Sequence, residues 1–67
     1  MNMNLDIEQA TEIAMKYAEK AGYPYSKIES IRHEDGHWIV AVKIDLLSGK
    51  EKIVTIDDQS GKVTGYE

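Results

Sequence analysis

The chain has 67 residues, enough for one domain with a modest core. Its 8 basic and 12 acidic residues give a net charge of −4, and the basic residues are scattered singly. Binding DNA or RNA through phosphates needs a basic stripe, so we expect no nucleic-acid partner. The chain has no cysteine, so no disulfide supports the fold.

Neither a membrane span nor a secretion signal is predicted. No apolar stretch approaches the roughly 20 residues of a membrane-spanning helix. The first four residues, Met1-Asn2-Met3-Asn4, contain neither a basic region nor an apolar core. We therefore expect a cytoplasmic protein without a membrane partner, unless the chain is cut from a longer one.

An amphipathic helix is predicted at about residues 7–21. Asp6, followed by Gln9 three residues later, has the pattern of a capping box. The helix should end at Gly22, because glycine favours the left-handed conformation that closes a helix, and Pro24 prevents continuation. Its apolar stripe is rich in alanine, which lets a helix lie close to a sheet. The stripe consists of Ile7, Ala10, Ile13, Ala14, Tyr17, Ala18 and Ala21.

Three glycine turns follow the helix, and runs of alternating apolar and polar residues separate them. This spacing predicts an antiparallel meander. The turns are Asp35-Gly36, Ser48-Gly49 and Ser60-Gly61. The four strands are predicted at about residues 27–34, 37–46, 50–57 and 62–66. The expected fold class is α+β, with one N-terminal helix packed on one face of a four-stranded antiparallel meander sheet, in a single domain spanning residues 1–67.

The first turn predicts how its flanking strands pair. Asp35-Gly36 suits a two-residue type I′ turn, which places His33 opposite Trp38. Both then lie on the side of the sheet that carries the large apolar residues. In the first strand Ile28 is out of phase with Ile31, and a β-bulge between them would correct the mismatch.

The second turn could have two or three loop residues. A three-residue loop at 47–49 pairs Val42 with Val54 and Val40 with Ile56, all on the face expected to meet the helix. A two-residue loop would turn Val54 and Ile56 outward. The apolar pattern therefore favours the three-residue loop.

One helix can cover only one face of a four-stranded sheet. The opposite face carries apolar residues near its middle and charges toward its ends. It is either a solvated face, as antiparallel sheets often have, or a contact surface for a second copy or another protein. The candidate interaction surface consists of Ile39, Ala41, Leu47 and Ile53.

No catalytic motif is found, so we expect neither an enzyme nor a cofactor. His33 and His37 flank the first turn and fall on opposite faces, so they cannot converge on one metal ion. Asp57, Asp58 and Ser60 lie in an oxygen-rich turn that resembles a calcium loop but lacks the ligand spacing of an EF-hand. Aspartate and serine also cap tight turns through side-chain hydrogen bonds, which is the alternative interpretation.

The motifs of the chain resemble those of PepSY-type domains. The resemblance rests on an alanine-rich helix ending at Ala21-Gly22, on the segment 35–42 around Trp38, and on the closing segments 54–57 and 60–63. Small gas-vesicle accessory proteins end in a similar way and are a weaker match.

The PepSY resemblance implies an α+β domain related to those in the propeptides of thermolysin-like proteases. Such domains bind or restrain peptidases and other partners and have no catalytic residues. The resemblance implies that the matching positions in this chain determine the fold. They are Trp38, Asp57, Gly61 and Val63.

Two hypotheses of function follow. The first is a non-enzymatic interaction module that binds a protein, or a second copy, through the open sheet face or an edge strand, and that modulates a peptidase or another partner. The second is a small acidic ion-binding (calcium) or regulatory protein that uses the Asp57–Gly61 loop.

Overall fold

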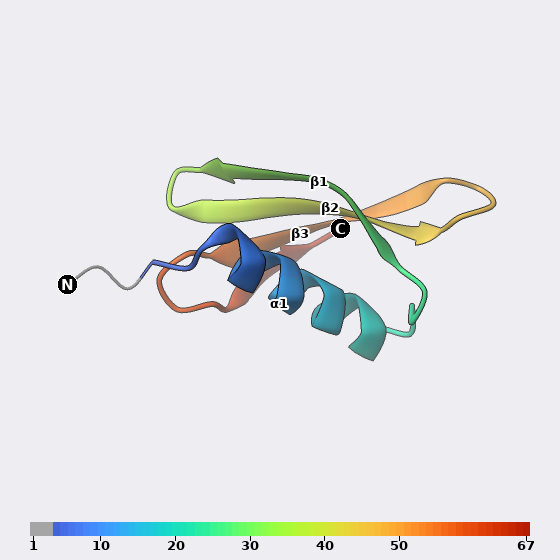
Figure 1. The fold of residues 1–67 in the computed structure, drawn as a ribbon, viewed down its shortest axis with the longest axis horizontal. Coiled ribbons are helices and arrows are strands. Elements are labelled where there is room, and N and C mark those ends of the chain that lie inside the picture. The colour runs from blue at the N-terminus through green and yellow to red at the C-terminus, as the bar shows by residue number, and fades with distance from the viewer. Residues whose placement is uncertain (1–3) are drawn as a thin grey trace.

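The computed structural model describes residues 4–67. One helix precedes four strands, which form a single antiparallel sheet in the order β1-β2-β3-β4. The elements are α1 (Ile7–Lys20), β1 (Lys27–Glu34), β2 (His37–Asp45), β3 (Lys50–Asp57) and β4 (Val63–Tyr66). The helix lies across one face of the sheet (Figure 1), which confirms the predicted α+β meander.

Local signals account for both ends of α1. The Asp6 carboxylate accepts a hydrogen bond from the Gln9 N–H (2.8 Å), and the Gln9 side chain accepts one from the Asp6 N–H (2.9 Å), so the capping box is confirmed. At the other end Gly22 adopts φ +104°, and the Tyr23 N–H donates to the Ala18 carbonyl at 3.0 Å. This Schellman closure ends α1 at Lys20, one residue before the predicted boundary.

The core lies between the alanine side of α1 and the two central strands. Its fully buried helix residues are all alanine, and its fully buried sheet residues are β-branched. Because alanine projects only one methyl group, the helix can approach the sheet closely enough to exclude water from the larger side chains. The core consists of Ala10, Ala14 and Ala18 from α1, Val40 and Val42 from β2, and Val54 and Ile56 from β3.

The predicted pairing of β1 with β2 is confirmed. Asp35 and Gly36 both adopt positive φ, +50° and +74°, and His33 pairs with Trp38. The register also shifts between Ile28 and Ser30, as a bulge does, and this brings Ile28 into the partly buried layer beside the core.

The predicted register of β2 against β3 is wrong by two residues. The connection at 46–49 has four residues rather than three, and the pairing is irregular between Lys43 and Asp45. Val54 pairs with Val40 instead of Val42, and Ile56 pairs with Trp38. Side chains alternate with a period of two, so a two-residue shift keeps Val40, Val54 and Ile56 on their predicted face.

The last hairpin forms at the predicted turn, Ser60-Gly61. Val63 pairs with Ile56, and the Asp57 N–H donates to the Lys62 carbonyl at 2.9 Å. The strand begins at Val63 rather than residue 62, and its pairing shifts once between Val63 and Gly65. The short β4 forms one edge of the sheet.

The close approach of α1 predicts a penalty for any larger residue in the alanine stripe. We expect Ala14→Leu to lower the free energy of unfolding by about 2 kcal/mol, because the added methylene groups have no space against the sheet. Urea unfolding followed by circular dichroism measures this change. Glu19→Leu, on the exposed side of α1, is the matched control. An equal effect of the two substitutions would contradict the close packing.

Candidate functional site

The face of the sheet opposite α1 is not covered by any element among residues 4–67. Ile39 on β2 is partly exposed, and Ile53 on β3 is 36% exposed. Ala41, also predicted for this surface, is only 8% exposed, and it lies between its pairing partners Ser30 and Ile53. Two isoleucines therefore provide most of the apolar area that the open face offers.

The fourth predicted residue, Leu47, lies at the tip of the β2–β3 hairpin, which extends past the end of α1 (Figure 1). Its side chain is 100% exposed, and that of its neighbour Leu46 is 61% exposed. Strand alternation continued past Ile44 would place Leu46 on the core side. The longer connection carries it out into solvent instead, so it joins the exposed apolar residues.

Hydrogen bonds hold this hairpin tip in one shape. The Asp45 carboxylate accepts hydrogen bonds from the N–H groups of Ser48 (3.3 Å) and Leu47 (3.0 Å). These two bonds, from Ser48 first, hold the pKa of Asp45 below its ordinary value. The left-handed Gly49 (φ +76°) completes the turn. These hydrogen bonds therefore fix the backbone that carries the exposed Leu46 and Leu47.

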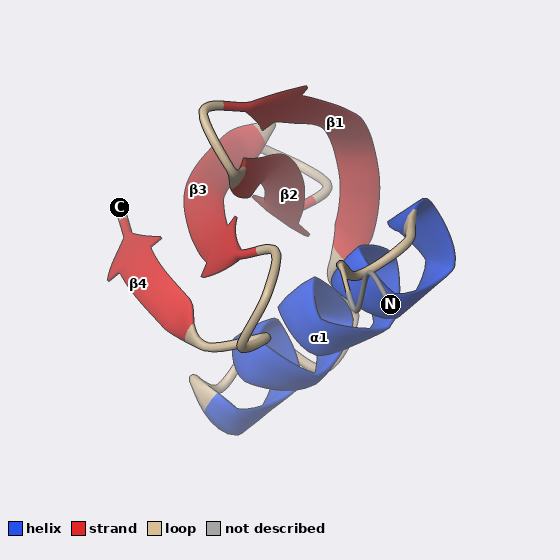
Figure 2. Cartoon of the chain, turned by 90° about the vertical axis from the view of Figure 1, so that its left-hand side faces the viewer, coloured by secondary structure: helices blue, strands red, loops and turns tan. Residues whose placement is uncertain are grey.

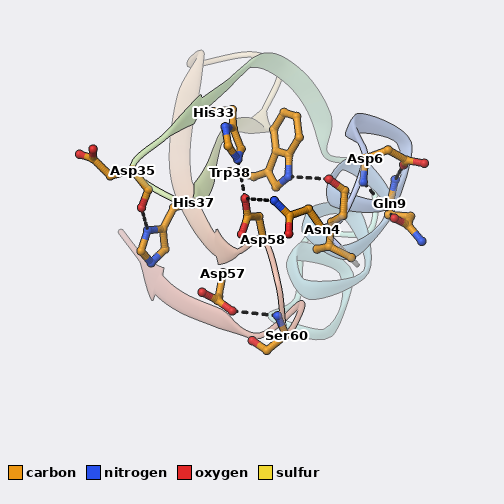
Figure 3. Close-up of polar contacts among 11 residues, drawn as sticks. Asn4, Asp6, Gln9, His33, Asp35, His37, Trp38, Asp57, Asp58 and Ser60 are labelled. Carbon is orange, nitrogen blue, oxygen red and sulfur yellow. Dashed lines mark hydrogen bonds and ion pairs between the residues drawn. The ribbon is translucent and has the colours of Figure 1, made fainter. Parts of the chain in front are cut away.

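The oxygen-rich turn at 57–61 uses its two carboxylates separately. Asp57 accepts a hydrogen bond from the Ser60 N–H at 2.8 Å, which lowers the pKa of Asp57. The Asp58 carboxylate instead pairs with His33 (Figure 3). Among residues 4–67, no group of three or more histidine, cysteine, aspartate or glutamate residues is arranged to hold a metal ion. Of the residues proposed as calcium ligands, Asp57 therefore caps the backbone of Ser60 and Asp58 contacts His33, and calcium binding stays a prediction.

A polar cluster around the buried Asp58, which the sequence did not reveal, joins the turn to β1. Asp58 Oδ2 lies 2.7 Å from His33 Nε2 and accepts a hydrogen bond from Asn4 Nδ2 at 3.3 Å (Figure 3). The Asp58 side chain is 5% exposed, and that of His33 is 44% exposed. A carboxylate buried to this extent needs such partners, since an unpaired one would be strongly unfavourable.

The same cluster attaches the segment before α1 to the sheet. The Leu5 N–H donates to the Asp58 carbonyl at 2.6 Å, and Trp38 Nε1 donates to the Leu5 carbonyl at 3.2 Å. The Trp38 and His33 rings lie 4.6 Å apart, as expected from their pairing. We call these contacts among Asn4, Leu5, His33, Trp38 and Asp58 the polar clasp.

The two histidines diverge as predicted. His33 contacts Asp58 beside the core, whereas His37 Nδ1 lies 2.9 Å from the carbonyl oxygen of Asp35 at the exposed turn (Figure 3). Their side chains belong to opposite faces of the hairpin, and no shared ligand position lies between them.

Comparisons with protein-family models, with curated proteins and with solved structures found no match to this chain. Kinship with PepSY-type domains therefore stays a prediction from the sequence motifs. Among the described residues, no helix is long and apolar enough to cross a membrane.

The polar cluster predicts that the buried Asp58 stabilises the fold more than an exposed carboxylate does. We expect Asp58→Ala to lower the free energy of unfolding by about 2 kcal/mol, because His33 and Asn4 lose their shared acceptor. Glu34→Ala, which removes an exposed ion pair with Arg32, should cost no more than about 0.5 kcal/mol. Urea unfolding measures the free energy of unfolding of both variants. Equal decreases for Asp58→Ala and Glu34→Ala would show that the clasp does not stabilise the fold.

The turn at 57–61 predicts a loss of stability in acid. Asp57 has a folded pKa below its ordinary value of 3.8, so its contribution is present above that value and is lost as pH falls through the folded pKa. Asp57→Asn should therefore weaken the fall in unfolding free energy below about pH 4. Urea unfolding across that range measures the slope, and an unchanged slope would contradict the assignment.

Proposed function

We propose that this protein is a non-enzymatic interaction module that binds another protein, or a second copy of itself, through the open sheet face. The observation that supports this proposal is the uncovered apolar surface of Ile39 and Ile53, together with the fully exposed Leu47 at the adjoining hairpin tip. Exposed apolar patches bordered by polar residues are typical of interaction surfaces.

Polar residues border the patch along β1. Arg32, which pairs with Ile39, forms an ion pair with Glu34 at 2.7 Å. Lys43 and Glu29 form a second pair, at 3.3 Å. Apolar residues at the centre with charged residues around them match the general anatomy of protein interfaces.

The resemblance to PepSY-type domains supports the same class of function. It suggests a peptidase as one kind of partner, and it is consistent with a chain that lacks a recognisable catalytic motif. The open face does not by itself distinguish a peptidase from other proteins, so the first experiment asks whether this face binds at all.

The double variant Ile39→Asp/Ile53→Asp tests the surface. We expect it to lose the partners that the native protein retains in a pull-down from the source cells, because two carboxylates would be buried against an apolar contact. If the partner is a second copy, sedimentation should instead show a native dimer that the variant abolishes.

Ile7→Asp/Tyr25→Asp is the matched control, since it replaces two exposed apolar residues elsewhere with the same change in charge. Circular dichroism checks that both double variants are folded. The proposal is wrong if the native protein and both variants retain the same partners and all sediment as monomers.

A further inference from the structure

A groove begins between the second half of α1 and Tyr66 of the edge strand β4 and continues along α1. Two adjoining hollows, of about 270 and 200 Å³, share Tyr17 and Lys20. Figure 2 shows β4 standing apart from the helix at the end of the sheet. The groove is lined by Ile13, Lys16, Tyr17, Lys20, Ala21 and Tyr66.

The backbone of β4 offers unpaired hydrogen-bonding groups beside this groove. The Glu67 N–H donates to the Ile53 carbonyl at 3.0 Å, and Tyr66 lies opposite Val54. Hydrogen-bonded and non-hydrogen-bonded pairs alternate in an antiparallel ladder, so the N–H and C=O of Tyr66 point away from β3. They are free to pair with a further strand.

The floor of the groove is aromatic. The rings of Tyr17 and Tyr66 lie 4.9 Å apart with a tilt of 58°, and Tyr17 is 37% exposed. The Tyr66 hydroxyl is buried without a hydrogen-bond partner among residues 4–67. Burial raises the pKa of Tyr66, and neighbouring Tyr23 and Tyr17 add to the effect. A strand laid beside β4 would cover the exposed part of this apolar floor.

The groove is lined by positive charges, whereas the whole chain has a negative net charge. Lys16 and Lys20 line the groove and no acidic residue does, although the chain carries a net charge of −4. Lys16 also forms an exposed ion pair with Glu12 at 3.7 Å, which leaves Lys20 as the stronger attraction for an anion. A third cation, Lys52 Nζ, lies 5.4 Å from the centre of the Tyr66 ring. Charge complementarity therefore favours an acidic ligand.

The other edge of the sheet is less suited to pairing. Strand β1 contains the bulge after Ile28 and four charged side chains along its eight residues up to Glu34, besides His33. Charges and bulges are the usual protection of an edge strand. Strand β4 (Val63–Tyr66) has no charged residue, and its pairing is regular from Gly65 onward.

We propose that the groove between α1 and β4 binds an extended acidic segment of another protein as a fifth strand of the sheet. The segment pairs with the free backbone of Tyr66. Alternate side chains then lie over Tyr17 and Tyr66, and its carboxylates face Lys16 and Lys20. The groove is separate from the open sheet face. The proposal for one site can therefore fail while the proposal for the other holds.

A library of random octapeptides displayed on phage, selected against the full chain, tests this proposal. Selected peptides should be rich in aspartate and glutamate alternating with apolar residues. Their affinity, measured by fluorescence anisotropy, should fall roughly tenfold for Lys16→Glu/Lys20→Glu, because two attractive charges become repulsive. Lys16→Gln/Lys20→Gln should give an intermediate loss. Bound peptide should also slow hydrogen exchange of the Tyr66 amide.

Lys27→Glu/Lys50→Glu is the matched control for charge, and Ile39→Asp/Ile53→Asp is the control for the open face. Both should leave peptide affinity unchanged. The proposal is overturned if no peptide is selected, if affinity survives the reversal of Lys16 and Lys20, or if the Tyr66 amide exchanges as fast with peptide as without. If exchange of the Tyr66 amide slows when only the protein concentration is raised, a second copy is the occupant. That result would overturn the choice of an acidic peptide.

Discussion

The close contact between the alanine stripe of α1 and the central strands is the constraint on which the rest of the structure depends. Ala10, Ala14 and Ala18 let one helix bury Val40 and Val54 completely, which a chain of 67 residues needs in order to have a water-free core. A single helix covers only one side of the sheet, so the same contact leaves the opposite face uncovered by any described element.

The polar clasp around Asp58 supplements this small core. It joins the turn after β3, the side chain of His33 and the segment before α1, through Leu5 and Trp38. The helix is therefore held to the sheet at its N-terminal end by hydrogen bonds as well as by packing. Toward its C-terminal end α1 meets β4 through the rings of Tyr17 and Tyr66, and the groove lies beside them.

The candidate surfaces were predictable to different degrees. The open face could be inferred from alternation alone, which placed Ile39 and Ile53 together. The exposure of Leu46 and the burial of Ala41 could not, because they depend on the length of the β2–β3 connection and on neighbours contributed by other strands. The groove was not foreseen, since Tyr17 and Tyr66 are far apart in the sequence and meet only after the sheet forms.

The sequence by itself determined the elements, their order and the face on which each strand residue lies. These properties follow from short-range physics: the capping box at Asp6, the positive φ at Gly36 and a side-chain period of two. Only the tertiary structure decided the register of β2 against β3 and the partners of Asp58. A register shift of two residues preserves every face, and a buried carboxylate acquires its partners from distant segments, so no local pattern records either outcome.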